Sequence, residues 1–313
     1  LDGGYGTKSF QVGANANEII SLTMTSTAAE DIGGYRTQLE GAANTGFGGV
    51  IAATTLAGAA STVATGDLTF TTDSVDTNVT IAAKSSAKDA AAAINLKSGE
   101  HGVAAQASTE VKLGAADAAG TTSFKLNGID IAATATTTTD QSALAKAIND
   151  KSDETGVIAT YNSDASITLK SSDGENIEID TYLNGTATAE LTAIDSNGDE
   201  NAVPVDLVSA GNDSATITGT LSLDSSKTFS VSGGATLTAT TQAAELSKVS
   251  EIKLTTEAGA QSALAVIDGA LAQIDDQRAD LGAVQNRFNY TISNLANIQE
   301  NVSASRSRIQ DTD

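Results

Sequence analysis

Apolar residues recur at every seventh position through the last part of the chain. This row consists of Ile267, Ile274, Leu281, Phe288, Leu295, Val302 and Ile309. A second row with the same spacing runs from Leu264 to Arg306 and is mixed, reading Leu, Leu, Arg, Gln, Ile, Gln, Arg. A strict seven-residue repeat is typical of a helix that packs lengthwise against other helices. The pattern therefore predicts a coiled-coil-type helix within 251–313, about 75 Å long at ~1.5 Å per residue, whose apolar stripe requires a partner.

The composition excludes most kinds of chemical site. The 313 residues include 39 acidic and 17 basic side chains, and the net charge of −22 opposes binding to nucleic acids and anionic membranes. There is no cysteine and only one histidine, His101, which excludes thiol catalysis, disulfides and Cys/His zinc sites. The most apolar stretch, around 50–60, is interrupted by Thr54, Thr55 and Gly58 and is too short to insert in a membrane. We expect no enzyme, cofactor or metal site.

The length predicts two or three compact units, and the composition changes at two points along the chain. Residues 1–36 contain two alternating segments separated by the turn-prone residues 13–17, which predicts a β-hairpin with one buried face. Residues 37–250 are rich in Thr, Ser, Ala, Gly and Asp, and residues 251–313 contain the heptad stripe. We therefore expect a hairpin and a long helix with β-rich domains inserted between them.

The middle segment contains an internal repeat with an offset of 54 residues. Ile94-Asn95 recurs as Ile148-Asn149, and Gly102-Val103 recurs as Gly156-Val157. Each copy has the pattern of strands, an Ala-rich helix, a glycine turn and a strand. The repeat predicts small α+β modules over about 65–115 and 120–180, followed by a β-rich stretch over 181–250.

Finer features are predicted within these modules. Asn127-Gly128 indicates a hairpin turn, and Asp140 is the expected N-cap of the second module's helix. We expect residues 167–169 to pair with residues 177–179 across Asp173-Gly174. We also expect a strand pair within 217–231, with Leu221, Leu223, Phe229 and Val231 on one face.

Four features resemble functional sites weakly. His101 is favoured as a turn residue over a metal ligand, because its counterpart in the second module is Thr155. The run 195–200, with Asp206 further on, suggests a calcium loop, but its glycine is at the fourth position, which favours a solvated acidic turn. The glycine-rich segment 46–49 lacks a Gly-Lys-Ser/Thr ending and is expected to be a linker. The threonines of 134–139 suit either O-linked glycans or an exposed strand and loop.

Several segments resemble bacterial flagellin. They are the run Gln277–Phe288, followed by Asn294-Leu295 and by residues 305–313, and the opening residues 1–15. The repeated Ile-Asn module is similar to the flagellin hook IN motif.

The resemblance implies an α+β multi-domain protein with an N-terminal rod-domain hairpin, inserted outer domains and a C-terminal rod helix. The implied function is that of a structural subunit of the bacterial flagellar filament, exported and self-assembling outside the cell, and serving motility. Implied partners are other flagellin subunits, the export chaperone, the cap protein and host Toll-like receptor 5. Flagellins also have N-terminal helices and a C-terminal core helix that are not in this sequence, so the resemblance implies a fragment that does not polymerise alone. The alternative is a surface adhesin or glycan-binding module.

The resemblance also assigns roles within the last helix. The row from Ile267 to Ile309 is expected to be the packing seam of the rod. Leu271, Asp280, Gln285 and Arg287 are expected on the exposed surface, facing neighbouring subunits or the receptor.

Overall fold

The computed structural model describes the chain in several segments and divides it into two compact units. The described residues are 6–12, 18–41, 44–201, 203–234, 237–238 and 240–311. Unit one comprises residues 1–34, 247–252 and 264–313, and unit two comprises 35–246 and 253–263. The predicted turn 13–17 lies outside the described residues.

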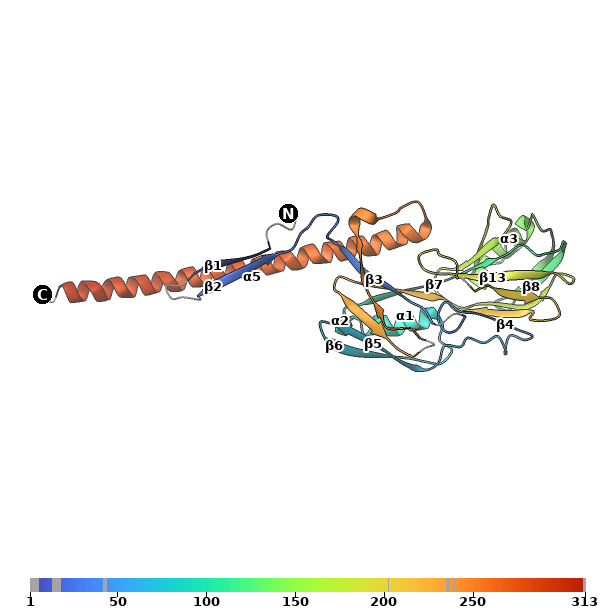
Figure 1. Cartoon of the computed structure of the whole chain (residues 1–313), viewed down its shortest axis with the longest axis horizontal. Helices are drawn as coiled ribbons and strands as arrows, with labels where there is room; N and C mark the ends of the chain where they lie inside the picture. Colours follow the sequence, from blue (N-terminus) through green and yellow to red (C-terminus); the bar gives the residue numbers. More distant parts are fainter. Residues whose placement is uncertain are drawn as a thin grey trace. The chain divides into compact units, whose positions relative to one another are not determined.

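Unit one combines a pair of strands with a long helix. Strands β1 (Gly6–Gln11) and β2 (Ile19–Met24) are antiparallel and place Phe10 opposite Ile20. The helix α5 (Glu257–Gln310) is 54 residues long, and the strands lie along it within unit one (Figure 1). The alternation and the heptad spacing therefore predicted the strands and the helix correctly. The predicted buried face is wrong for β1, whose six residues are all exposed, and in β2 only Ile20 is buried. A short 3₁₀ helix (Val249–Glu251) also belongs to this unit.

Two glycines allow strand β3 (Gly33–Leu39) to begin close against α5. A Cβ atom on Gly269 would lie 2.6 Å from the Cα atom of Gly34, and a Cβ on Gly34 would lie 3.2 Å from the carbonyl oxygen of Ala265. Any side chain at Gly269 would therefore push the strand and the helix apart.

The described residues of unit two form three sheets and four short helices, and the unit also includes the first residues of α5. The eight-stranded sheet has the order β10 (Ile158–Tyr161), β11 (Ile167–Ser171), β7 (Ala104–Leu113), β16 (Thr220–Ser225), β3, β19 (Glu245–Lys248), with β13 (Thr188–Ile194) paired to β7 and β14 (Val205–Val208) paired to β13. The five-stranded sheet has the order β4 (Val50–Ala53), β15 (Ser214–Ile217), β12 (Ile177–Leu183), β8 (Gly120–Leu126), β9 (Ile129–Thr136). The four-stranded sheet has the order β18 (Gln242–Ala243), β17 (Phe229–Ser232), β5 (Gly66–Thr72), β6 (Val75–Ile81). The helices are α1 (Ala87–Leu96), α2 (Ser98–His101), α3 (Ser142–Asn149) and α4 (Ser152–Thr155).

These layers enclose two hydrophobic cores. The α1 core includes Phe70, Ile94, Val103, Leu221 and Val231. The α3 core includes Leu126, Leu144, Ile148, Ile179 and Tyr182. Strand β7 serves both, because Ala105 lies in the α1 core while Val111 and Leu113 lie in the α3 core.

Two segments of unit two have corresponding elements at the 54-residue offset. Strands β5 and β8 have seven residues each, and helices α2 and α4 have four each. The β5–β6 turn has positive φ at Asp73 (52°) and Ser74 (64°), as the β8–β9 turn has at Asn127 (49°) and Gly128 (81°). The glycine predicted to end the helical part, Gly102 or Gly156, is left-handed in both segments.

The asparagine of each Ile-Asn pair joins its helix to the following strand. The Asn95 amide donates to the carbonyl of Ala105 and accepts its N–H, both at 2.8 Å. The Asn149 amide makes the same two bonds with Ala159, at 2.7 and 2.8 Å.

The local strand-pairing predictions were wrong. Strand β11 pairs with β10 and β7, whereas β12 pairs with β8 and β15, so 167–169 and 177–179 lie in different sheets. Likewise β16 pairs with β7 and β3, whereas β17 pairs with β5 and β18. Alternation specifies which face of a strand is buried but not which strand lies beside it.

The predicted capping position was one residue too early. The N-cap of α3 is Gln141, although the Asp140 carboxylate accepts the N–H of Ser142 at 2.8 Å.

Candidate functional site

The heptad row on α5 is partly covered and partly open. Ile274, Leu281, Phe288 and Leu295, in the middle of the row, are half-buried. The two last members, Val302 and Ile309, are 62% and 71% exposed, and Ile267 is also exposed. The apolar stripe therefore extends beyond the part of the helix that unit one itself covers.

At Phe288, the strand pair of unit one covers the row. The rings of Phe10 and Phe288 meet edge to face with centroids 5.7 Å apart. The amide of Gln277 also donates a hydrogen bond to the Thr25 hydroxyl. Sequence reasoning missed this pairing, although Phe10 and Ile20 both had the alternation of a buried face.

The four residues expected on the outer surface of α5 are all exposed. At 3.6 residues per turn, Asp280 and Arg287 lie about one heptad apart on one flank of the seam, while Leu271 and Gln285 lie on the other flank. The helix therefore presents them as two pairs and does not gather them into one patch.

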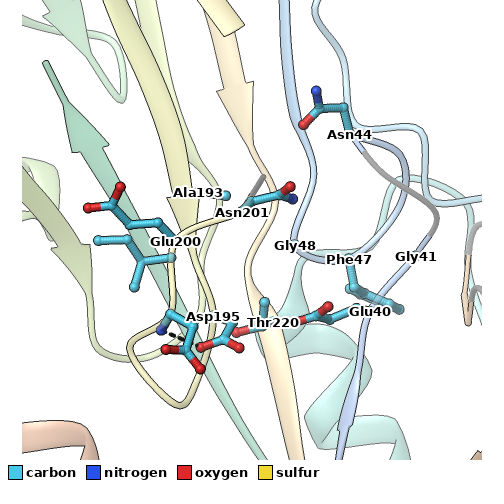
Figure 2. Close-up of a pocket in the computed structure, with 12 residues that line it drawn as sticks. Glu40, Gly41, Asn44, Phe47, Gly48, Ala193, Asp195, Glu200, Asn201 and Thr220 are labelled. Carbon is cyan, nitrogen blue, oxygen red and sulfur yellow. Dashed lines mark hydrogen bonds between the residues drawn. The ribbon is translucent and has the colours of Figure 1, made fainter. Parts of the chain in front are cut away.

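Unit two has an acidic pocket of about 300 Å³ between the end of β3 and the loop after β13. Figure 2 shows Glu40, Asp195 and Thr220 close together in it. Burial, and then the charge of Asp195, raise the pKa of Glu40 above its ordinary value. The buried hydroxyl of Thr220 has no hydrogen-bond partner among the described residues.

The loop that begins at Asp195 is closed by its own first carboxylate. Asp195 Oδ1 accepts the N–H groups of Asn197 and Asp199, each at 2.8 Å, and Oδ2 accepts the amide of Gln38 at 3.1 Å. These bonds support an acidic turn more than a calcium loop. In the described part of the chain, no group of three or more His, Cys, Asp or Glu side chains is placed to hold a metal ion.

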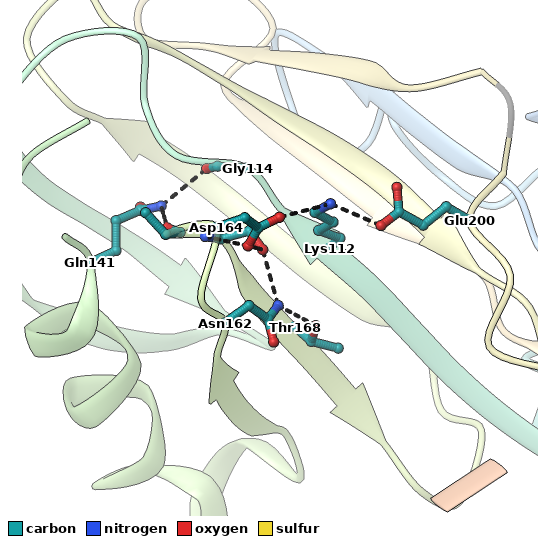
Figure 3. A network of polar contacts seen from close by, with 9 residues as sticks. Lys112, Gly114, Gln141, Asn162, Asp164, Thr168 and Glu200 are labelled. Atoms are coloured by element: carbon teal, nitrogen blue, oxygen red, sulfur yellow. Dashed lines mark hydrogen bonds and ion pairs between the residues drawn. The ribbon is translucent and has the colours of Figure 1, made fainter. Parts of the chain in front are cut away.

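A polar network ties two loops to strand β7 (Figure 3). Lys112 Nζ lies 2.8 Å from Glu200 Oε1 and 3.1 Å from Asp164 Oδ2. The hydroxyl and N–H of Ser166, together with Lys112, lower the pKa of Asp164 to about 2. Because the charges are paired and hydrogen-bonded, the network fixes the loops and presents no free acid, base or nucleophile.

The remaining weak signals also have structural explanations. The N–H of Gly48 donates to the carbonyls of Thr218 and Gly219, and the side chain of Phe47 between the glycines is buried. His101 is buried at the end of α2. No described helix is both long and apolar enough to cross a membrane.

Comparisons with known proteins match two parts of the chain to family descriptions. Residues 264–313 match the bacterial flagellin C-terminal helical region, which covers most of α5. Residues 118–173 match the flagellin hook IN motif, which covers β8 through β11.

Curated proteins similar to the chain carry related names. The chain is 43% identical over 187 residues to the B-type flagellin of Pseudomonas aeruginosa, a match that spans 57% of this chain and 38% of the relative. It is 40% identical over 151 residues to flagellin D of Vibrio cholerae, spanning 48% and 36%. It is 68% identical over 65 residues to polar flagellin A of Vibrio parahaemolyticus, spanning 21% and 17%. The chain thus matches well under half the length of these relatives.

Proposed function

We propose that the chain belongs to the bacterial flagellin family and is part of a structural subunit of the flagellar filament. Such a subunit assembles with copies of itself outside the cell and serves motility. The observation that carries the proposal is the match of the flagellin C-terminal region to α5, a helix with an apolar stripe that continues past its cover. The family favours a structural subunit over an enzyme, and over an adhesin or glycan-binding module.

In this proposal the seam of α5 joins a coiled-coil-type rod. Val302 and Ile309 are exposed apolar side chains in register with the half-buried residues before them. An exposed apolar stripe of this length is costly in water, and further helices would cover it. Residues 1–36 and 251–313 then form the rod part, and residues 37–250 form the outer domains.

The outer domains in this proposal contain two copies of the hook IN module. Support comes from the equal offset of their strands, turns and glycines, and from the equivalent bonds of Asn95 and Asn149. Over the whole chain, 39 acidic residues stand against 17 basic ones, and this excess of negative charge would keep neighbouring outer domains apart by repulsion.

Leu271, Asp280, Gln285 and Arg287 are proposed as contacts to neighbouring subunits and to Toll-like receptor 5, with the export chaperone and the cap protein as further partners. Support for the surface role is their exposure on the two flanks of the seam. We expect weak signalling in a receptor-reporter cell assay by this chain alone, because the family resemblance places part of the receptor surface on further helices.

An assembly experiment tests the proposal. The terminal segments of the Pseudomonas aeruginosa B-type flagellin are joined to the two ends of this chain, and the product is examined by electron microscopy and sedimentation. We expect long filaments from the joined protein and none from the chain alone. A joined protein that folds but stays monomeric under polymerising conditions would contradict the filament function.

Two variants of the joined protein separate the proposed roles of α5. Leu281→Asp places a charge in the seam and is expected to abolish both rod folding and filaments. Arg287→Asp changes an exposed flank and is expected to leave the monomer folded while weakening assembly. Equal effects on folding would show that the two positions do not have the roles assigned here.

A further inference from the structure

The only histidine of the chain closes the junction between α2 and β7, with both ring nitrogens held by backbone groups. Its Nδ1 accepts the N–H of Val103 at 3.1 Å, and its Nε2 lies 3.2 Å from the carbonyl oxygen of Ile94. Since a carbonyl only accepts and an amide N–H only donates, Nε2 carries the proton and Nδ1 has none. The contacts therefore select the neutral imidazole with its proton on Nε2.

The ring lies inside the α1 core. His101 is 2% exposed and stacks on Phe70 with centroids 4.6 Å apart and planes 17° from parallel. Burial lowers the pKa of His101 below its ordinary value. A second proton would occupy Nδ1, where it would face the N–H of Val103, and would place a positive charge in an apolar layer.

The charged groups around the ring do not offset the free-energy cost of protonating His101. Lys97 and Glu100, on its own segment, act on the His101 pKa in opposite directions. On the β5–β6 hairpin, Asp67 and Asp76 accept hydrogen bonds from threonine hydroxyls at the exposed surface.

The polar and charged groups on β16 and at the tip of the β5–β6 hairpin are likewise bonded to partners other than the His101 ring. On β16, Asp224 pairs with Arg36 at 3.3 Å, while Ser225 donates to the carbonyl of Gly102. At the tip of the β5–β6 hairpin, Asp73 pairs with Lys227 at 2.8 Å.

At the 54-residue offset, a hydroxyl that does not titrate makes the corresponding bond to the following strand, although its carbonyl partner belongs to a different residue of the helical segment. The Thr155 hydroxyl accepts the N–H of Val157 at 3.2 Å and donates to the carbonyl of Lys151 at 3.0 Å. Thr155 is also buried and precedes the left-handed Gly156, as His101 precedes Gly102. The chain thus contains its own proton-insensitive control.

We infer that His101 is a proton-sensitive closure of the α2–β7 junction, which opens in acid while the α4–β10 junction, closed by Thr155, stays shut. This inference does not depend on the filament function. At mildly acidic pH the α2–β7 junction would therefore loosen, whereas the corresponding α4–β10 junction would not.

The direction follows from proton linkage. Unfolded or opened chain binds a proton at the ordinary histidine pKa of about 6.5, whereas the closed junction binds it only at a lower pH. The stabilisation that the closed junction provides is therefore complete above about pH 6.5, and it declines as the pH falls toward the lowered pKa of His101. Within that window the open population rises roughly tenfold per pH unit.

The test is amide hydrogen exchange of the full 313-residue chain by NMR between pH 7.5 and 5, corrected for intrinsic rates. We expect the protection of the Val103 and Ala105 amides to fall as the pH drops below about 6.5, by up to roughly tenfold per pH unit until the lowered pKa of His101 is reached. The protection of the Val157 and Ala159 amides should not fall in this way. His101→Thr, which copies the other junction, should remove the difference. Equal loss at both junctions, or a pH-dependent loss that persists in this variant, would overturn the inference.

Two further measurements keep the test decisive if His101→Thr fails to fold. His101→Gln retains a donor and an acceptor without titrating near neutral pH, and it should also abolish the pH dependence. In the unaltered chain, the single histidine ring signal reports the protonation directly. A titration midpoint at or above about 6.5 in the folded chain would show that closure does not oppose protonation.

Discussion

At the scale of single residues, two asparagines have the clearest structural roles. Asn95 and Asn149 each use both ends of the amide to hold one residue of the following strand, ten positions further on. The amide of asparagine carries a donor and an acceptor on one planar group that does not titrate, and this short side chain sets the helix–strand separation. The Ile-Asn pair therefore combines a core anchor, Ile94 or Ile148, with a backbone clamp.

We predict that Asn149→Asp destabilises the chain by about 1–3 kcal/mol at neutral pH, because the donor to the Ala159 carbonyl is replaced by a carboxylate oxygen that opposes it. Urea unfolding followed by circular dichroism measures the change. Asn197→Asp adds the same charge to an exposed loop and should alter stability by less than about 0.5 kcal/mol. Similar losses in both variants would mean that added charge, and not the lost donor, is responsible.

At the scale of elements, the heptad row of α5 packs against a strand pair in its middle. A seven-residue repeat predicts that a stripe is buried but not the kind of element that buries it. Here Phe10 of β1 contacts Phe288, and the neighbouring Ile20 of β2 is buried, so the strand pair covers the row at Phe288. The ends of the row remain available to other helices.

Removing the aromatic contact should release the strands from the helix. Phe288→Ala is expected to cost about 1–2 kcal/mol of local stability and to speed amide exchange in β1 and β2, measured by mass spectrometry. Tyr290→Ala is the matched control, since Tyr290 is an aromatic residue of the same helix turn that is 79% exposed. If both variants leave β1 and β2 equally protected, the ring contact does not hold the strands.

At the scale of the whole molecule, unit two contains both hydrophobic cores. Strand β7 runs through both, with Ala105 in the α1 core and Val111 in the α3 core. Loss of either core would leave half of this strand without its packing. The two cores are therefore expected to unfold together.

A fragment spanning 35–263 tests this coupling, because it holds every described residue of unit two. We predict that it folds alone and unfolds in one urea transition. NMR signals of His101 report the α1 core and those of Tyr182 report the α3 core, and their midpoints should coincide in the fragment and in the full chain. Separate midpoints would show that β7 does not couple the cores, and an unfolded fragment would show that unit two requires unit one.

Local patterns in the sequence were sufficient for several conclusions. The heptad row predicted the long helix, and alternation predicted the β1–β2 pair. Asn127-Gly128 predicted the turn between β8 and β9. Each of these features depends on residues that are close in the chain. The resemblance to flagellins rested on the run Gln277–Phe288 and on the Ile-Asn pairs, and the matched regions 264–313 and 118–173 contain that run and the second of these pairs. The roles assigned to Leu271, Asp280, Gln285 and Arg287 remain predictions.

Other features depended on contacts between distant residues and required the tertiary structure. Alternation correctly predicted that Leu221, Leu223, Phe229 and Val231 share a core, but not that their strands lie in different sheets. The contact of Phe10 with Phe288 and the burial of His101 against Phe70 also join separate segments. The sequence by itself determined the long helix, the β1–β2 pair and the absence of thiol chemistry. The tertiary structure alone decided which faces meet, because the spacing of apolar residues indicates that a face is buried but not which residues bury it.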